Sequence, residues 1–157
     1  MDVHSFAEAA ETGETGERLV LGGVEIPFER ALLGHSDADV LAHAVTDALF
    51  GAAGLEDIGH YFPDTDEQYR DADSIELLRK ARIIVGGDWQ VGNVDAVVIC
   101  ERPKIRDHRE AMRRNLAKAL GVEPARVGVR GTTTERLGFA GRGEGIAAQA
   151  VCLLEIH

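Results

Sequence analysis

Three polar side chains recur at four-residue spacing in the segment GHSDADVLAHAVTD, which begins at Gly34. They are Asp39, His43 and Asp47, and at about 100° per residue they fall within a narrow arc if the segment is a helix. The apolar residues of the same helix lie on roughly the opposite side: Leu41, Val45, Ala48, Leu49 and Ala52. We therefore expect that His43 is not a core histidine, although a merely solvated helix face would show the same arc.

A second short pattern, DVH near the start of the chain, places a carboxylate and an imidazole two residues apart. If this segment is extended, Asp2 and His4 point the same way, because side chains alternate along a strand. Together with His43 they supply one carboxylate and two imidazoles, a ligand set suited to zinc with a fourth position left open for a substrate. A D-x-H pattern alone is weak evidence, so this interpretation depends on the polar residues elsewhere in the chain.

The remaining polar side chains are concentrated in loops rather than spread over helices. Four loops carry them: DIGHYFPDTD at 57–66, ERPK at 101–104, GTTTE at 131–135 and GFAGRGEG at 138–145. The threonines of GTTTE supply hydroxyl and amide donors beside a carboxylate that can hold Mg²⁺, an arrangement suited to a diphosphate. Lys104 adds a positive charge. Taken singly, TTT is also typical of a strand end, and GRGEG and the Pro63-Asp64 pair are typical of ordinary turns.

The bulk composition limits the class of protein. The 157 residues are 45% hydrophobic and 28% charged, which is enough for one compact core, and we assign 1–157 to a single domain. The formal net charge of -10 argues against general binding to nucleic acids or membrane surfaces, since both are polyanionic. A small anionic ligand remains compatible with that charge if basic residues are local.

Cysteine usage and hydropathy bear on the cellular location. Cys100 and Cys152 have no paired spacing, so the sequence indicates neither a disulfide framework nor a cysteine zinc site. There is no apolar run long enough to span a bilayer and no signal-peptide pattern. We therefore expect a cytoplasmic protein, or a plastid one if the source is a plant.

The elements that must position these residues can be read from the turn and cap signals. The segment RLVLGGVEIP predicts a hairpin around Gly22-Gly23. The helix with the polar arc is expected to start near Ser36 or Asp37 and to stop at Gly54.

Two further helices are expected. One starts at about Asp73, with Glu76 placed as in a capping box, and runs to Gly86-Gly87. The other is expected to be capped by Asp107 and to end at Gly121.

Three strands complete the predicted elements, at 94–100, 127–131 and 146–156. The polar segment AEAAETGETGE at 7–17 is typical of a surface loop. This order predicts an α+β sandwich, with one β-sheet and helices packed against one of its faces.

Several motifs, taken together and in this order, resemble those of one known family. They are HSDADVLAHAVTDALFGAAG, DIG, FPDTD, NVD, PK, TTTE, LGF and GRGEGIA. Jointly they are very specific, although no single one would suffice. From Asp2 nearly to the C-terminus, the chain resembles the 2-C-methyl-D-erythritol 2,4-cyclodiphosphate synthases of the non-mevalonate isoprenoid pathway.

The resemblance implies a metal-dependent phosphorus-oxygen lyase with one Zn²⁺ and one Mg²⁺ in each active site, Mn²⁺ being an alternative to Mg²⁺. It implies three zinc ligands: Asp2, His4 and His43. It implies that Glu135 binds the magnesium ion, which bridges the α- and β-phosphates of the substrate. His35 and Thr133 are implied to stabilise the transition state.

The resemblance also implies which residues contact the substrate. Those at the methylerythritol phosphate end are Ser36, Asp57, Gly59, Phe62, Pro63, Asp64, Thr65 and Asp66. Further substrate-binding residues are Asp2, His4, His35 and Ile58. Those of the cytidine pocket, which act largely through their backbone, are Cys100, Pro103, Lys104, Ile105 and Arg106. Those at the diphosphate are Thr132, Thr133, Thr134 and Glu135. Phe139 and Arg142 match family positions near a threefold axis, where a central cavity can take up an isoprenoid diphosphate.

The implied reaction is an intramolecular ring closure. The 2-phosphate of 4-diphosphocytidyl-2-C-methyl-D-erythritol 2-phosphate attacks the β-phosphorus of its own CDP group, and CMP departs. The family is homotrimeric, with active sites between adjacent subunits.

Two alternatives from other functional classes remain open at this point. A metal-dependent phosphohydrolase would use the same histidines and carboxylates to activate water, and it would release a linear phosphate. A non-catalytic trimeric module would bind a nucleotide or an isoprenoid diphosphate without turnover.

Overall fold

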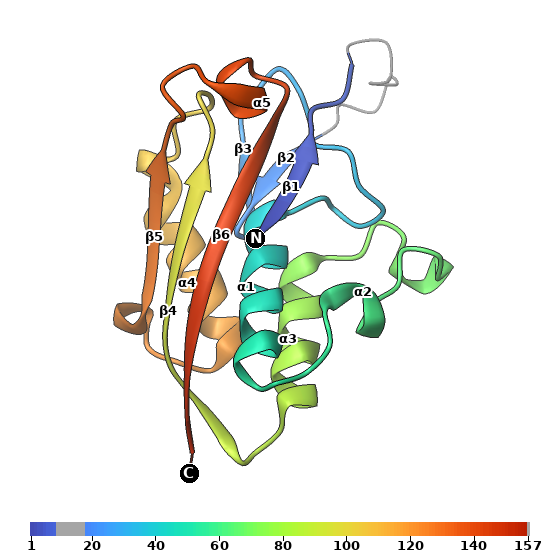
Figure 1. The fold of residues 1–157 in the computed structure, drawn as a ribbon, viewed down its shortest axis with the longest axis vertical. Helices are drawn as coiled ribbons and strands as arrows, with labels where there is room; N and C mark the ends of the chain where they lie inside the picture. Colours follow the sequence, from blue (N-terminus) through green and yellow to red (C-terminus); the bar gives the residue numbers. More distant parts are fainter. Residues whose placement is uncertain (9–17, 157) are drawn as a thin grey trace.

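A four-stranded sheet forms one layer of the molecule, and helices cover one of its faces (Figure 1). The computed structural model describes residues 1–8 and 18–156. The strand order across the sheet is β1 (Asp2–Ser5), β6 (Gly145–Ile156), β4 (Trp89–Ile99) and β5 (Val127–Thr132). The strands β4 and β5 are parallel, whereas β6 runs antiparallel to both β1 and β4. β1 and β5 therefore lie at opposite edges of the sheet.

Three long helices pack together against this sheet (Figure 1): α1 (Val40–Ala52), α3 (Ser74–Val85) and α4 (Arg109–Leu120). The shorter helical segments are α2 (Ile58–Tyr61), η1 (Glu67–Tyr69), η2 (Arg106–His108), η3 (Pro124–Arg126) and α5 (Gly138–Gly141). Within 1–8 and 18–156, no helix is both long and apolar enough to cross a membrane. The predicted α+β arrangement of sheet and helices is confirmed.

One feature of the predicted fold, a single sheet, is wrong. The hairpin is present as predicted, but β2 (Leu19–Leu21) and β3 (Val24–Ile26) pair with each other in a separate two-stranded sheet. The turn between them lies against the helices, since a Cβ added at Gly22 would meet Met112 and Leu41 side chains at 2.9 to 3.1 Å. The hairpin therefore packs on α1 and α4 instead of extending the main sheet.

The prediction for the start of α1 is also wrong, and so is the exposed position expected for Asp39. The helix begins at Val40, and Asp39 is its N-cap with no exposed surface. Its carboxylate accepts hydrogen bonds from the backbone N–H groups of Gly22 (2.8 Å), Gly23 (2.7 Å) and Ala42 (3.0 Å). Burial raises the pKa of Asp39, and these three donors oppose the rise. Asp39 thus ties the hairpin to the helix.

Of the two other predicted helix starts, that of α3 is confirmed and that of α4 is wrong. Asp73 caps α3 as expected, and its side chain accepts from the N–H of Ile75 at 2.8 Å. The predicted cap of α4 by Asp107 is wrong, because α4 begins at Arg109 after His108. Asp107 lies inside η2, and this 3-10 turn leads directly into α4, so the helix starts without a side-chain cap. The predicted end at Gly121 is confirmed, with φ at 72°.

The two faces of β6 differ in what covers them. Five residues of alternate register belong to the hydrophobic core or pack against it, on the helix side: Ile146, Ala148, Ala150, Cys152 and Leu154. On the opposite face, Val151 is 65% exposed and Leu153 is 54% exposed. Val3 of β1 is paired with Ala147 of β6 and shares this face, and it is 43% exposed. The sheet therefore carries apolar side chains on the face that the helices leave bare.

Two positions near β1 are tightly packed. A Cβ added at Gly145 would lie 2.4 Å from the carbonyl oxygen of His4, so β6 can approach β1 this closely only at a glycine. Ala7 is fully buried, and its N–H donates to the carbonyl of Ala31 at 2.9 Å. The surface loop predicted at 7–17 is therefore wrong for Ala7, and from residue 9 onward it lies outside the described residues.

Candidate active site

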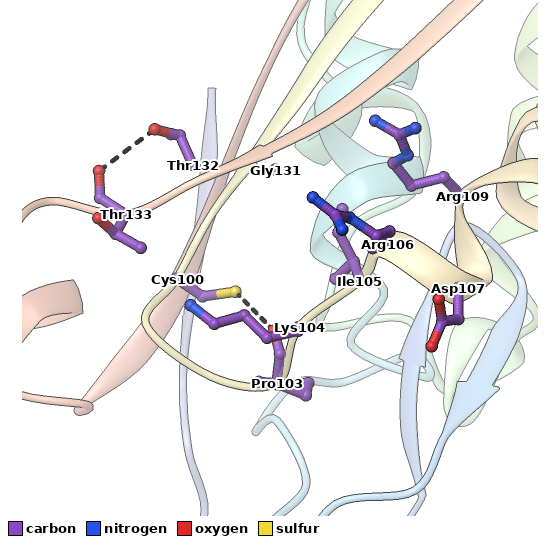
Figure 2. Close-up of a pocket in the computed structure, with 10 residues that line it drawn as sticks. All are labelled: Cys100, Pro103, Lys104, Ile105, Arg106, Asp107, Arg109, Gly131, Thr132 and Thr133. Atoms are coloured by element: carbon purple, nitrogen blue, oxygen red, sulfur yellow. Dashed lines mark hydrogen bonds between the residues drawn. The ribbon is translucent and has the colours of Figure 1, made fainter.

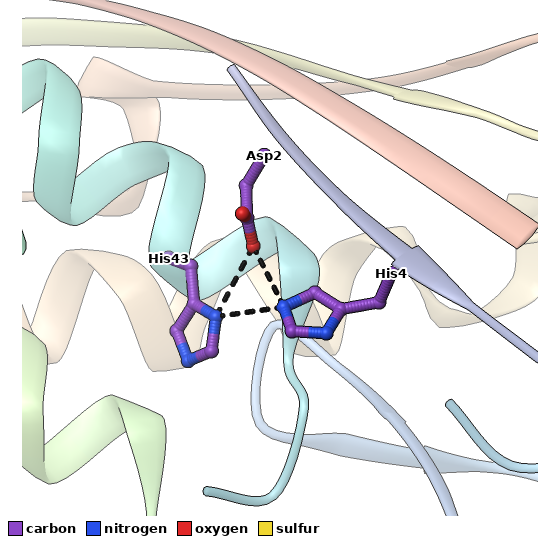
Figure 3. Close-up of side chains that lie close together, drawn as sticks. All are labelled: Asp2, His4 and His43. Atoms are coloured by element: carbon purple, nitrogen blue, oxygen red, sulfur yellow. Dashed lines mark hydrogen bonds and ion pairs between the residues drawn. The ribbon is translucent and has the colours of Figure 1, made fainter. Parts of the chain in front are cut away.

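Asp2, His4 and His43 converge on one point between β1 and α1, and we call them the metal cluster (Figure 3). Oδ2 of Asp2 lies 2.9 Å from Nε2 of His4 and 3.1 Å from Nδ1 of His43. The two nitrogen atoms are 3.2 Å apart. β1 presents Asp2 and His4 on the same side, as predicted, because the residue between them points to the other face.

The hydrogen bonds of His4 fix which of its nitrogens faces the cluster. Nδ1 of His4 lies 2.6 Å from the carbonyl oxygen of Leu33. Since a carbonyl oxygen can only accept, Nδ1 carries the proton. Nε2 of the neutral ring is then a bare lone pair directed at the cluster, which is the form that binds a metal ion.

The size of the cluster fits a tetrahedral metal ion. Bonds of 2.0 to 2.2 Å from zinc to nitrogen and oxygen place neighbouring ligand atoms about 3.3 Å apart in a tetrahedron. The three observed separations, from 2.9 to 3.2 Å, lie only slightly below that value. Among the described residues, this is the group of histidine and carboxylate side chains whose ligand atoms meet in this way.

The charges of the metal-free cluster stabilise one another. Burial by itself raises the pKa of Asp2, but hydrogen bonds from His4 and His43 outweigh it and bring the pKa well below its usual range. Burial lowers the pKa of His4, and the hydrogen bonds to Asp2 and to the Leu33 carbonyl more than reverse this, so the net shift is upward. A divalent cation bound between the three side chains would replace the protons that His4 and His43 share with Asp2.

A separate pocket of about 650 Å³ opens where β4 and β5 end, and we call it the strand-end pocket (Figure 2). Its lining includes Cys100, Pro103, Lys104, Ile105, Arg106, Asp107, Arg109, Gly131, Thr132 and Thr133. Burial raises the pKa of the Cys100 thiol to about 11, and its sulfur lies 3.4 Å from the carbonyl oxygen of Pro103. Cys100 is therefore a neutral wall of this pocket rather than a nucleophile.

Thr132 ends β5 and begins a tight turn, residues 132–136, which we call the threonine turn. Glu135 (φ 53°) and Arg136 (φ 66°) both adopt a left-handed backbone conformation, which is costly for residues other than glycine. One carboxylate oxygen of Glu101 accepts from the N–H groups of Thr134 (3.3 Å) and Arg136 (3.1 Å). Glu101 therefore ties this turn to the loop that follows β4.

The predicted residues of the 57–66 loop form a third group. Asp57 caps α2 by accepting from the N–H of His60 at 3.0 Å. The carboxylate of Asp66 accepts from the N–H of Gln68 at 3.0 Å. His35 joins this group, since its Nε2 lies 3.0 Å from the carbonyl oxygen of Asp66.

Ser36 is closer to the metal cluster than to this loop. Its Oγ lies 3.1 Å from Nε2 of His43. Phe139 and Arg142 belong to yet another place, on and just after α5, where Arg142 is paired with Glu144 at 2.7 Å.

The structure does not bring the metal cluster and the strand-end pocket of one chain together. Asp2 and His4 lie on β1, at one edge of the sheet, and the pocket surrounds the end of β5 at the other edge. Two strands separate these edges, and with strands about 4.8 Å apart the edges are about 14 Å from each other.

Two residues near the metal cluster were missed by the sequence analysis. They are Ser74, whose hydroxyl lies 2.8 Å from Nε2 of His43, and Asp37, which is hydrogen-bonded to Ser74. Ser74 follows the capping residue of α3 and is fully buried, and the unusual burial of a polar residue is visible only in the structure. The HSD triplet contains Asp37, but its spacing to His43 gave no signal.

The fold and the cluster define a class: an α+β protein with a candidate metal centre of one carboxylate and two imidazoles at the edge of its sheet. The chain belongs to the YgbB family, whose family model matches residues 1–155. It is 79% identical over 155 residues to the 2-C-methyl-D-erythritol 2,4-cyclodiphosphate synthase of Rubrobacter xylanophilus, covering 99% of this chain and 92% of that protein. The resemblance inferred from the motifs is thereby confirmed.

Solved structures with similar sequences share the fold of this chain. The bifunctional IspDF from Campylobacter jejuni matches 99% of this chain with a TM-score of 0.90 and 43% identity, and this chain spans 41% of that longer protein. The CDP complex of IspF from Plasmodium falciparum matches 99% of this chain and 91% of its own, with a TM-score of 0.79 and 32% identity.

Proposed function

We propose that this protein cyclises 4-diphosphocytidyl-2-C-methyl-D-erythritol 2-phosphate to 2-C-methyl-D-erythritol 2,4-cyclodiphosphate and releases CMP, as a step of isoprenoid precursor biosynthesis. The match to a synthase of this name over nearly the whole of both chains carries the proposal. The metal cluster supports it independently, since its donor set fits a divalent cation beside a position that a substrate phosphate can occupy.

The reaction makes modest demands on acid-base chemistry. The attacking group is a phosphate of the substrate, which is already an anion, so no strong general base is required. The bond that forms joins an oxygen of the 2-phosphate to the β-phosphorus, and the bond that breaks releases CMP. Folding the substrate back on itself is an orientation effect, worth up to about 7 to 11 kcal/mol in well-placed intramolecular reactions.

The residues of the metal cluster would hold a zinc ion through Asp2, His4 and His43. When bound, this ion supplies positive charge that offsets the repulsion between phosphates and polarises a phosphoryl oxygen. The chain has a net charge of -10, so bound metal ions, together with the local cations of the strand-end pocket, would balance the anionic substrate. An acidic protein can therefore act on a substrate rich in phosphate.

The strand-end pocket is the proposed cytidine site. Its lining includes the five predicted cytidine residues, and the solved CDP complex of the Plasmodium falciparum relative supports a nucleoside diphosphate as the occupant. The lining carries Lys104, Arg106 and Arg109, so three positive charges are available to the diphosphate. Glu135, next to the threonines, would hold Mg²⁺, or Mn²⁺ in its place, through one carboxylate and the substrate phosphates.

His35 and Thr133 are the proposed stabilisers of the transition state. Thr133 lines the strand-end pocket, and its hydroxyl lies 3.3 Å from a carboxylate oxygen of Glu135. His35 is tied to the 62–66 segment through the Asp66 carbonyl. This loop, with Ser36 and the DIG residues, would hold the methylerythritol phosphate end.

A homotrimer with shared active sites is part of the proposal. The metal cluster and the strand-end pocket of one chain lie at opposite sheet edges, so a substrate that must contact both is better served by two neighbouring subunits. The bare sheet face with Val3, Val151 and Leu153 offers an apolar surface for such an assembly. Phe139 and Arg142, near α5, would then lie close to a central cavity able to take up an isoprenoid diphosphate.

One assay tests the proposed function against both alternatives. The protein is incubated with the CDP-methylerythritol phosphate substrate, Zn²⁺ and Mg²⁺, and the products are followed by phosphorus NMR. The cyclase yields a cyclic diphosphate together with CMP. A linear phosphate product would instead identify a phosphohydrolase, and binding of CDP without any turnover would identify a non-catalytic module. Either of these two outcomes would overturn the proposal.

A further inference from the structure

Ser74 is a fully buried polar residue that adjoins the metal cluster without belonging to it. It is the first residue of α3, and its hydroxyl oxygen lies 2.8 Å from Nε2 of His43. Nε2 is the nitrogen of His43 that points away from Asp2 and His4, since Nδ1 is the atom that faces them. Ser74 therefore contacts the outer side of a predicted metal ligand.

Asp37 holds the hydroxyl of Ser74 in one orientation. The Ser74 hydroxyl is hydrogen-bonded to Oδ1 of Asp37, and the backbone N–H of Ser74 donates to Oδ2 at 3.0 Å. Oδ1 of Asp37 also accepts from the N–H of Asp39 at 3.2 Å, directly before α1. The Asp37 carboxylate thus joins the starts of α1 and α3, and it fixes the position of the hydroxyl between them.

The direction of these hydrogen bonds follows from counting protons. An ionised carboxylate can only accept, so the single hydroxyl proton of Ser74 goes to Asp37. Ser74 Oγ can then only accept from His43, and Nε2 must carry the proton. In the neutral imidazole this leaves Nδ1 as a bare lone pair, directed at the same point as Nε2 of His4 and Oδ2 of Asp2.

We propose that Asp37 and Ser74 act as a positioning pair that fixes the tautomer and the ring orientation of His43 for metal binding. The inference rests on the proposed metal centre and names a part of it that the ligand set alone does not include. It mirrors the role of the Leu33 carbonyl at His4, with a side-chain pair in place of a backbone acceptor. Outer hydrogen-bond partners of metal-bound histidines typically contribute about 10- to 100-fold in metal affinity.

The test measures metal binding directly. Zinc affinity is determined by competition with a chromophoric chelator, and the coordination geometry is read from the visible spectrum of the Co²⁺-loaded protein. We expect Ser74→Ala to bind zinc about 10- to 100-fold more weakly than the parent protein and to show an altered Co²⁺ spectrum. Asp37→Asn is expected to weaken zinc binding as well, because its amide can donate to Ser74 and remove the forced direction of the hydroxyl.

A second variant is needed because the hydroxyl of Ser36 also lies close to Nε2 of His43, at 3.1 Å. This hydroxyl can partly replace Ser74 as an acceptor, so Ser74→Ala combined with Ser36→Ala is expected to give the larger loss of affinity. Thr46→Val is the matched control. Thr46 is also fully buried, on the same helix as His43, and its hydroxyl donates to the Ala42 carbonyl at 2.8 Å, away from the cluster.

The outcomes separate this inference from the proposed function. Unchanged zinc affinity and an unchanged Co²⁺ spectrum in both Ser74→Ala and Asp37→Asn would overturn the positioning role, whatever the enzyme activity. An equal loss of affinity in folded Thr46→Val would overturn it too, because the effect would then be general to buried hydroxyl groups. Failure of the parent protein to form a cyclic product would refute the proposed reaction alone, since metal affinity is measured without substrate.

Discussion

The metal cluster and the strand-end pocket are built from different kinds of structure. Asp2, His4 and His43 lie on a strand and a helix, and buried polar groups fix the positions of these elements. The strand-end pocket is lined mainly by the segment that follows β4 and by the end of β5, with Thr132 and Thr133 of the threonine turn. The candidate metal ligands are therefore held by packing, whereas the proposed phosphate-binding groups are held by a few local hydrogen bonds.

In each region a carboxylate accepts backbone hydrogen bonds that tie two segments together, and Asp39 and Glu101 differ in their burial. Asp39 is fully buried and accepts three backbone hydrogen bonds where the hairpin meets α1. Glu101 is only partly buried and accepts two, where the loop after β4 meets the threonine turn. A rigid ligand set suits a metal ion that stays bound, and a less buried turn suits a nucleotide that must enter and leave in each cycle.

The largest expected effect comes from removing a metal ligand. In His43→Ala, bound zinc and cyclase activity should fall together, with activity reduced by more than about 100-fold, since even the outer partners of metal ligands are worth 10- to 100-fold. The fold should persist, because His43 faces the cluster and not the hydrophobic core. Metal analysis, activity and circular dichroism on the same sample check this. Full zinc occupancy in the folded variant would remove His43 from the ligand set.

Mixing two variants tests whether the metal cluster and the strand-end pocket of one active site come from different subunits. The His43→Ala protein is mixed with a second protein that carries both Lys104→Ala and Glu135→Ala in its pocket. Each of the two proteins is expected to be inactive alone. With random subunit exchange in equal amounts, about a quarter of shared sites receive an intact metal cluster and an intact pocket, so about a quarter of the activity should return. Sites contained within single chains would recover nothing, even when mass spectrometry confirms that subunits have exchanged.

A smaller effect is expected from Glu135→Gln, which keeps the size of the side chain and removes its charge. The Mg²⁺ concentration needed for half-maximal activity should rise about tenfold, while zinc content stays at the parent level. Activity titrated against Mg²⁺ gives the comparison, with zinc measured on the same preparations. Identical magnesium curves would show that Glu135 is not the ligand, and would leave TTTE as an ordinary strand end.

Replacing Asp39 or Glu101, the two carboxylates compared above, is expected to have the smallest effect on the reaction. The effect on stability should be clear. Asp39→Ala loses a helix cap and leaves the amides of Gly22 and Gly23 without their acceptor, at a cost of about 2 to 4 kcal/mol. This should lower Tm by roughly 5 to 15 °C. Glu101→Ala should lower it by only a few degrees, because its partners can turn to water. Thermal unfolding of both variants in parallel gives the two Tm values. A lower Tm for Glu101→Ala than for Asp39→Ala would refute the prediction.

The sequence predicted the elements well where local signals are strong. The hairpin around Gly22-Gly23, the cap at Asp73 and the stop at Gly121 all depend on a few neighbouring residues. The D-x-H strand and the helix with His43 also follow from short patterns, and the structure brings their side chains together as expected. Local chemistry sufficed for each of these.

The errors arose where a distant segment decides the outcome. Asp39 looked like part of an exposed arc, yet the hairpin lies over it and satisfies its carboxylate. Asp107 looked like a cap, but the preceding 3-10 turn leads directly into α4. Ser74 and Asp37 gave no signal, because their relation to His43 exists only after α1 and α3 have packed.

The close approach of β6 to β1 restricts which mutations the enzyme can accept. Any side chain at position 145 would collide with the backbone of His4, so β1 would have to move away from β6 and carry the two candidate metal ligands Asp2 and His4 with it. In a library of random variants, Gly145 should therefore behave like a ligand position although it has no side chain to offer. Selection for metal binding would act on a residue that lies 141 positions further along the chain than the histidine it protects.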